Sequence, residues 1–172
     1  MMKLTHPTLL SLSMASMLAI ASPSETTLEK FKIAVIKDTT GSSELMQGDY
    51  TSGMHKLTSA KESSTGFDID MGLCAANLKH LKFEQAEEAC SDAIEGIDAH
   101  AARSREGKFI KALALSNRGI VRYLQDDSYG ALEDFSSALL LSDSKVIKDN
   151  LAYLKVSMSK RTLGTDTVEL TE

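Results

Sequence analysis

The stretch FEQAEEACSDA, residues 83–93, recurs later in the chain as SYGALEDFSSA, residues 128–138. Both contain a small residue, a larger residue four positions on and an alanine seven positions on: Ala86, Cys90 and Ala93, then Ala131, Phe135 and Ala138. A weaker copy, residues 48–60, places Gly53, Leu57 and Ala60 in the same order. Such recurrence is typical of helical hairpins that each contact only their neighbours and together form a binding surface.

The composition favours one helical domain. The 172 residues are 42% hydrophobic but only 5% aromatic, with no tryptophan, which suits closely packed helices better than a β-sandwich. The 19 basic and 24 acidic residues are spread along the chain without a long basic run. Nucleic acid and an anionic membrane surface are therefore not expected as partners.

Residues 1–21 are predicted to be a cleaved signal peptide. Lys3 precedes an apolar run over residues 9–20, and Ala19 and Ala21 put small residues where a signal peptidase needs them. The run is shorter than the roughly 20 residues that span a bilayer, so no stable membrane span is expected. The alternative is an N-terminal helix of the fold. A bacterial periplasm is the favoured destination of the exported chain.

The rest of the chain divides by its hydrophobic spacing. Residues 22–41 are predicted to be extended or mobile, and within them FKIAVIK, residues 31–37, is expected to pack along the first hairpin. Helical spacing then predicts a domain over residues 42–160, with a polar tail at 161–172. Its expected parts are three hairpins and a capping helix, at about 42–60, 68–97, 109–141 and 145–160.

One interval is longer than the others. Ala86 follows Gly53 by 33 residues, but Ala131 follows Ala86 by 45. The excess lies in residues 98–108 and has the length to extend the flanking helices by about three turns. Gly107 is the expected break between them.

The run Asn117-Arg118-Gly119-Ile120-Val121-Arg122-Tyr123-Leu124, followed by the small and large residues of the second copy, resembles a tetratricopeptide repeat (TPR). The resemblance is good over residues 112–143, fair over 67–100 and partial over 41–61. It implies an all-α solenoid, a right-handed superhelix of antiparallel hairpins, and protein binding. The chain departs from the family in Gly53, where alanine is usual, in the insertion, and in lacking the proline that closes each unit.

The resemblance also implies a ligand groove lined by the first helix of each hairpin. Carried over to this sequence, the groove residues are Lys79, Asn117, Tyr123 and Asn150. The two asparagines would lie one above the other and bind the backbone of an extended peptide, or alternatively brace a neighbouring helix. Arg118 and Arg122 are expected to be solvated or paired with acids. The lysines and arginines with which the family binds a terminal carboxylate are not present as a set.

The two cysteines have two interpretations. A hairpin centred on Lys82 places Cys74 and Cys90 opposite one another, each eight residues from the centre. A disulfide needs Cα atoms within about 7 Å, closer than typical helix axes, which the small residues nearby would permit. The alternative is two buried thiols that act as small apolar fillers.

No pattern of catalytic or metal-binding residues is found. The histidines are dispersed and the chain has neither a Gly-x-Ser-x-Gly turn nor a Gly-rich phosphate loop, so no enzyme activity, cofactor or metal is expected. The sequence predicts an exported adaptor or co-chaperone-like module that binds a protein or peptide partner in the cell envelope. The alternative is a self-associating structural or assembly scaffold of the envelope.

Overall fold

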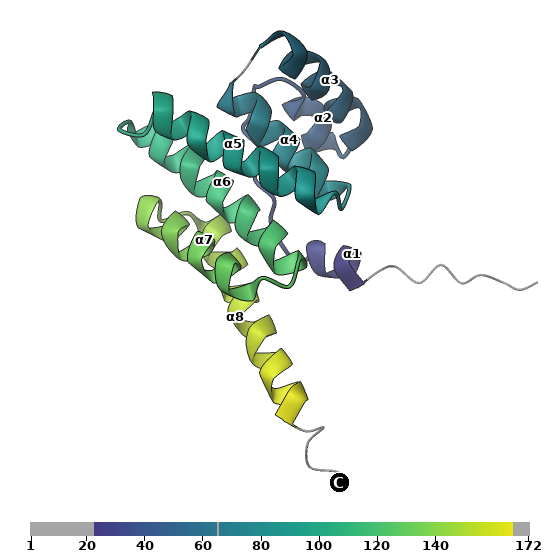
Figure 1. Cartoon of the computed structure of the whole chain (residues 1–172), viewed down its shortest axis with the longest axis vertical. Coiled ribbons are helices and arrows are strands. Elements are labelled where there is room, and N and C mark those ends of the chain that lie inside the picture. The colour runs from purple at the N-terminus through teal and green to yellow at the C-terminus, as the bar shows by residue number, and fades with distance from the viewer. Residues whose placement is uncertain (1–22, 65, 167–172) are drawn as a thin grey trace, which may run out of the picture.

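The computed structural model describes residues 23–64 and 66–166, and every regular element within them is an α-helix (Figure 1). The eight helices of this part of the chain are α1 Pro23–Leu28, α2 Ser42–Gln47, α3 Tyr50–Ser63, α4 Phe67–Lys79, α5 Phe83–His100, α6 Arg105–Leu124, α7 Ser128–Leu141 and α8 Lys145–Asp166. The expectation of an all-α chain is confirmed for these residues. The expected signal peptide, residues 1–21, lies outside them.

Helices that follow one another in the sequence pack against one another, from α2 through to α8. Helices α5 and α6 are antiparallel. Glu87 near the start of α5 contacts Arg122 near the end of α6, and Asp98 near the end of α5 contacts Lys111 in the first half of α6. The connections are short, as expected for antiparallel neighbours. The C-terminal part of α8 projects away from the other helices (Figure 1).

The repeated small residues lie where helices approach most closely. A Cβ atom on Gly119 of α6 would come within 3.2 Å of the Phe135 ring and 3.3 Å of the Ala131 carbonyl oxygen on α7. Phe135 is fully buried in the space that these small residues leave. The alanines of both copies are also fully buried: Ala86, Ala93, Ala131 and Ala138.

Equivalent aspartates begin the second helix of two hairpins. Asp49 precedes α3, and its Oδ1 accepts a hydrogen bond from the Ser52 N–H at 3.1 Å. Asp127 precedes α7, and its Oδ1 accepts from the Gly130 N–H at 2.8 Å. Each carboxylate thus satisfies an amide that the first turn of a helix cannot pair, and it is favourably placed in the helix dipole.

The insertion lengthens both flanking helices, but the predicted break at Gly107 is wrong. The chain turns at residues 101–104, and Gly107 lies in the first turn of α6, where its N–H donates to Ser104 Oγ at 2.8 Å. A Cβ on Gly107 would lie 2.0 Å from the Ala101 carbonyl oxygen. Glycine is therefore required at position 107 because its backbone lies close to that of Ala101, and not because it forms the turn itself.

The N-terminal region differs from the expectation for residues 22–41. It begins with α1, continues as residues 31–36, which are neither helix nor strand, and turns into α2. Residues 31–36 are called the extended segment here. They contact α6 and α8 and do not lie along the first hairpin alone. Leu28, Phe31 and Ala34 are buried in the main core. Val35 packs against the smaller core cluster of α2–α4, and Ile33 packs against both clusters.

The end of the chain also differs from the expectation. The sequence predicts that the last helix ends near residue 160 and that a polar tail covers residues 161–172. Instead α8 continues to Asp166, and residues 167–172 lie outside the described part.

Candidate peptide-binding site

Three of the four residues predicted for the groove meet at the chain's own extended segment. Asn117 and Tyr123 reach it from α6 and Asn150 from α8. The fourth, Lys79, ends α4, with its ammonium group 5.5 Å from the ring centre of Tyr50. The structure therefore brings the two asparagines and the tyrosine together around residues 31–34.

Each asparagine binds one backbone unit, meaning both the N–H and the C=O group of a single residue. Asn150 Oδ1 accepts from the Lys32 N–H at 2.8 Å, and its Nδ2 donates to the Lys32 carbonyl at 3.0 Å. Asn117 Oδ1 accepts from the Ala34 N–H at 2.8 Å, and its Nδ2 donates to the Ala34 carbonyl at 2.9 Å. An amide side chain can make this pair of bonds to any extended residue, because it uses no side chain of the bound segment.

The two asparagines are almost completely buried, at 0% and 1% exposure. A buried polar group without a partner costs about 1–3 kcal/mol, so these amides and the backbone groups they bind stabilise each other's burial. Asn150 Nδ2 also donates to Ser116 Oγ on α6 at 3.1 Å. Asn150 therefore both braces the neighbouring helix and binds the extended segment.

An aromatic pocket holds the start of the extended segment. The Phe31 ring lies edge-on to Tyr153 at 4.8 Å and to Tyr123 at 5.5 Å, and it stacks on Phe135 at 6.3 Å between ring centres. Phe31 is only 5% exposed. The pocket joins residues of α6, α7 and α8, so the segment links three helices through one side chain.

A charged pair lies beside the first backbone unit. The Lys32 ammonium binds the Asp149 carboxylate, which also accepts from Lys145 Nζ at 2.9 Å. The hydrogen bond from Lys32, followed by that from Lys145, lowers the pKa of Asp149 below its ordinary value of 3.8. Exposed pairs of this kind contribute little stability, so the backbone and aromatic contacts dominate the attachment.

A cavity of about 520 Å³ borders the extended segment. Residues 33–35 and Lys37 form one wall. The other walls come from α2, α3, α4, the first half of α6 and the start of α8. Met46 and Phe109 line it and remain 61% and 45% exposed. Lys79 lines this cavity and does not contribute to the asparagine site.

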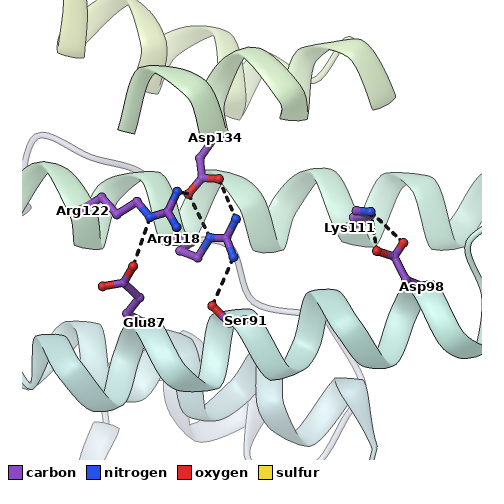
Figure 2. Close-up of polar contacts among 7 residues, drawn as sticks. All are labelled: Glu87, Ser91, Asp98, Lys111, Arg118, Arg122 and Asp134. Carbon is purple, nitrogen blue, oxygen red and sulfur yellow. Dashed lines mark hydrogen bonds and ion pairs between the residues drawn. The ribbon is translucent and has the colours of Figure 1, made fainter. Parts of the chain in front are cut away.

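The two arginines of α6 connect three helices (Figure 2). Arg118 binds Asp134 of α7 through two nitrogens and Ser91 Oγ of α5 through a third. Arg122 donates to Glu87 of α5 and also pairs with Asp134. Both arginines are paired with acids, one of the two arrangements expected from the sequence. They hold the two hairpins together and take no part in the asparagine site.

Cys74 and Cys90 are joined in a disulfide, with their Cα atoms 4.9 Å apart. The bond connects α4 to α5, and both residues are fully buried. The small residues beside the bond permit the close approach, since Ala86 and Ala89 of α5 are buried in the same core cluster as the two cysteines.

Sequence reasoning missed the residues that Asn117 and Asn150 bind. It assigned Asn117 and Asn150 to a separate peptide or to bracing a neighbouring helix. It did not pair them with Lys32 and Ala34, which lie 118 and 83 residues from their partners. The available signal was the aromatic and branched run at residues 31–36, which has no second strand to pair with. A lone extended run in a helical protein needs side chains to satisfy its backbone, and buried asparagines are suited to this.

Neither family models nor curated proteins nor solved structures give a match to this chain. None of the described helices combines the length and apolar character needed to cross a bilayer. Among the described residues, no three histidine, cysteine or carboxylate side chains are placed to hold a metal ion.

Proposed function

We propose that this protein is an exported, TPR-like module that binds a protein or peptide partner in the cell envelope, in a bacterial periplasm. Its successive hairpins would form a right-handed superhelix. Two observations support this proposal. Small residues recur at the helix contacts of the hairpins α4–α5 and α6–α7, and equivalent asparagines occur 33 residues apart on α6 and α8. The export step rests on the sequence of residues 1–21 alone.

The observation that carries this proposal is the asparagine pair bound to an extended backbone. Asn117 and Asn150 are held in position by burial, and together they bind alternate backbone units. A surface that binds one extended chain in this way has the geometry for recognising peptides. Because the chain's own segment uses both asparagines, the partner would bind in the adjoining cavity.

Photocrosslinking in the native envelope tests this function. A crosslinking amino acid at position 46 or 109 replaces a partly exposed residue of the cavity wall, Met46 or Phe109. The matched control places it at Val156, which is 54% exposed on α8 and does not line the cavity. We expect one dominant adduct with another protein from both cavity positions and none from the control. Absence of any adduct from the cavity positions would contradict the function.

Self-association as a scaffold is the second candidate, favoured by exposed apolar side chains on α7. Tyr129 and Leu140 are 83% and 88% exposed and lie about three turns apart on one face of α7, which a second copy of the chain would cover. Light scattering over a range of protein concentrations tests this candidate. A scaffold would grow in mass with concentration and would be dissociated by Leu140→Glu, whereas a strict monomer excludes it.

A further inference from the structure

The two asparagines determine which way each backbone unit of the extended segment faces. Lys32 and Ala34 direct both their N–H and their C=O groups to the asparagine amides. In an extended chain, these two groups point to one side in one residue and to the opposite side in the next. The N–H and C=O groups of Ile33 and Val35 therefore face away from the asparagines. These four groups are called the open edge below.

Within the described part of the chain, the two N–H and two C=O groups of the open edge have no protein partner. Across residues 26–64 and 66–160, no hydrogen bond joins the backbone groups of Ile33 or Val35 to another residue. The same two residues line the cavity of about 520 Å³ and pack towards α2–α4. An unpaired row of backbone groups beside an apolar surface is a template for another extended chain.

The other walls of the cavity suit apolar side chains and a negative charge. Leu45, Met46 and Tyr50 face the extended segment from α2 and α3, and Phe109 adds an aromatic ring from α6. Lys37 and Lys79 are the charged residues of the lining, which includes no carboxylate among the described residues. Lys37 is 76% exposed and only loosely paired with Asp38, at 3.9 Å.

We propose that the cavity binds an extended peptide from another protein, which pairs its backbone with Ile33 and Val35 and so adds a strand beside the extended segment. The peptide has apolar residues at alternate positions and a carboxylate near Lys37 and Lys79. This inference rests on the proposed function and specifies its partner. Strand addition would supply affinity through the backbone, and the apolar walls would supply specificity.

The shape of the open edge favours an extended peptide over a helix or a small molecule. Alternate residues of an extended chain lie about 6.6 Å apart, so Ile33 and Val35 present two donor–acceptor pairs at that spacing. Another extended backbone carries matching pairs at the same interval. A helix has already used its backbone groups internally, and a small apolar molecule would leave the open edge unpaired.

The test uses the full-length protein and the synthetic peptide acetyl-Thr-Val-Thr-Val-Thr-Val-Glu with a free C-terminal carboxylate. Amide hydrogen exchange is followed by NMR at residues 32–35. At a peptide concentration ten times its dissociation constant, we expect exchange at Ile33 and Val35 to slow about tenfold. Exchange at Lys32 and Ala34, whose amides are already paired, should change little. A peptide with N-methyl groups on its five central amides keeps every side chain and should give no protection.

Matched variants test the cavity walls without altering the asparagine site. Met46→Glu and Phe109→Glu place a negative charge at partly exposed positions and should raise the dissociation constant of the peptide at least about fivefold. Val156→Glu makes the same kind of change at an exposed apolar position outside the cavity and should leave binding unchanged.

Three results would overturn strand addition: no binding of the peptide at millimolar concentration, equal binding of the N-methylated peptide, or binding without protection of Ile33 and Val35. Protection that rises with protein concentration in the absence of peptide would also overturn it, because the occupant would then be a second copy of this chain. If these tests fail but crosslinking from positions 46 and 109 still captures a partner, the proposed function stands and only the mode of recognition is wrong.

Discussion

The guanidinium of Arg118 and the carboxylate of Asp134 form a two-point ion pair between α6 and α7, with Nε–Oδ2 and Nη2–Oδ1 distances of 3.0 and 2.8 Å. The Asp134 side chain is 3% exposed, and that of Arg118 is 18% exposed. Hydrogen bonding to Asp134 raises the pKa of Arg118, so this guanidinium stays charged. Arg122 gives the carboxylate a second cation, at 3.1 Å. A nearly buried carboxylate thus has its charge compensated from one side by two residues of α6.

Removing both partners of this pair should cost less than the sum of the two single losses. Asp134→Ala leaves two arginines facing each other and should lower the free energy of unfolding by about 3 kcal/mol. Arg118→Met leaves the buried carboxylate with one cation and should also destabilise the protein. The double variant should be more stable than the sum of the two losses predicts, by at least about 1 kcal/mol. Urea denaturation measures all three, with Ser136→Ala as a neutral control on the same helix. Strict additivity would contradict the coupling.

The sequence predicts the helices more closely than it predicts the position of the N-terminal region. Recurring alanines with a larger residue between them favour close helical packing. The pairs α4–α5 and α6–α7 accordingly begin and end within a few residues of the expected hairpins at 68–97 and 109–141. The composition of residues 31–36 predicts an extended conformation, but it does not predict which helices the segment contacts. Its partners, Asn117 and Asn150, lie far along the chain, and no local pattern encodes that pairing.

Gly107 was misplaced for a different physical reason. In a sequence, a glycine at a helix end and a glycine that permits a close backbone approach look alike. The distance that distinguishes them, 2.0 Å from an added Cβ to the Ala101 carbonyl oxygen, exists only in the folded chain. The position of the cavity, which depends on α2, α3, α4, α6 and α8 together, could not be predicted for the same reason.

The disulfide should contribute measurably to stability under oxidising conditions. Closing a loop of 16 residues between Cys74 and Cys90 should contribute about 3 kcal/mol, mainly by restricting the unfolded chain. Cys74→Ala combined with Cys90→Ala should lower the free energy of unfolding by about that amount, and reduction of the wild type should have a similar effect. Mass spectrometry after alkylation without a reductant provides the direct check. Two labelled thiols in the native protein would show that the bond does not form.

Each asparagine should protect a different amide of the extended segment. Asn150→Ala removes both partners of the Lys32 backbone, and Asn117→Ala removes both partners of the Ala34 backbone. Each change should destabilise the protein by about 1–3 kcal/mol, because buried polar groups lose their bonds. Exchange should accelerate first at Lys32 in one variant and at Ala34 in the other, as NMR can resolve. Asn77→Ala is the control, since its Nδ2 makes only a 3.5 Å contact with a carbonyl. Unchanged exchange at both amides would contradict the assignment.

The attachment of the extended segment should weaken in acid because of Asp149. The hydrogen bonds from Lys32 and Lys145 lower the pKa of this carboxyl in the folded chain below its ordinary value of 3.8. A group with a lowered folded pKa contributes stability above its unfolded pKa and loses that contribution as the pH falls through the folded pKa. In urea titrations, Asp149→Asn should therefore be less stable than the wild type above pH 3.8, and the two should converge in stronger acid. Added salt should reduce the difference at neutral pH, because the pair is partly exposed. A difference that stays constant across this pH range would mean that the charge of Asp149 does not contribute to the attachment.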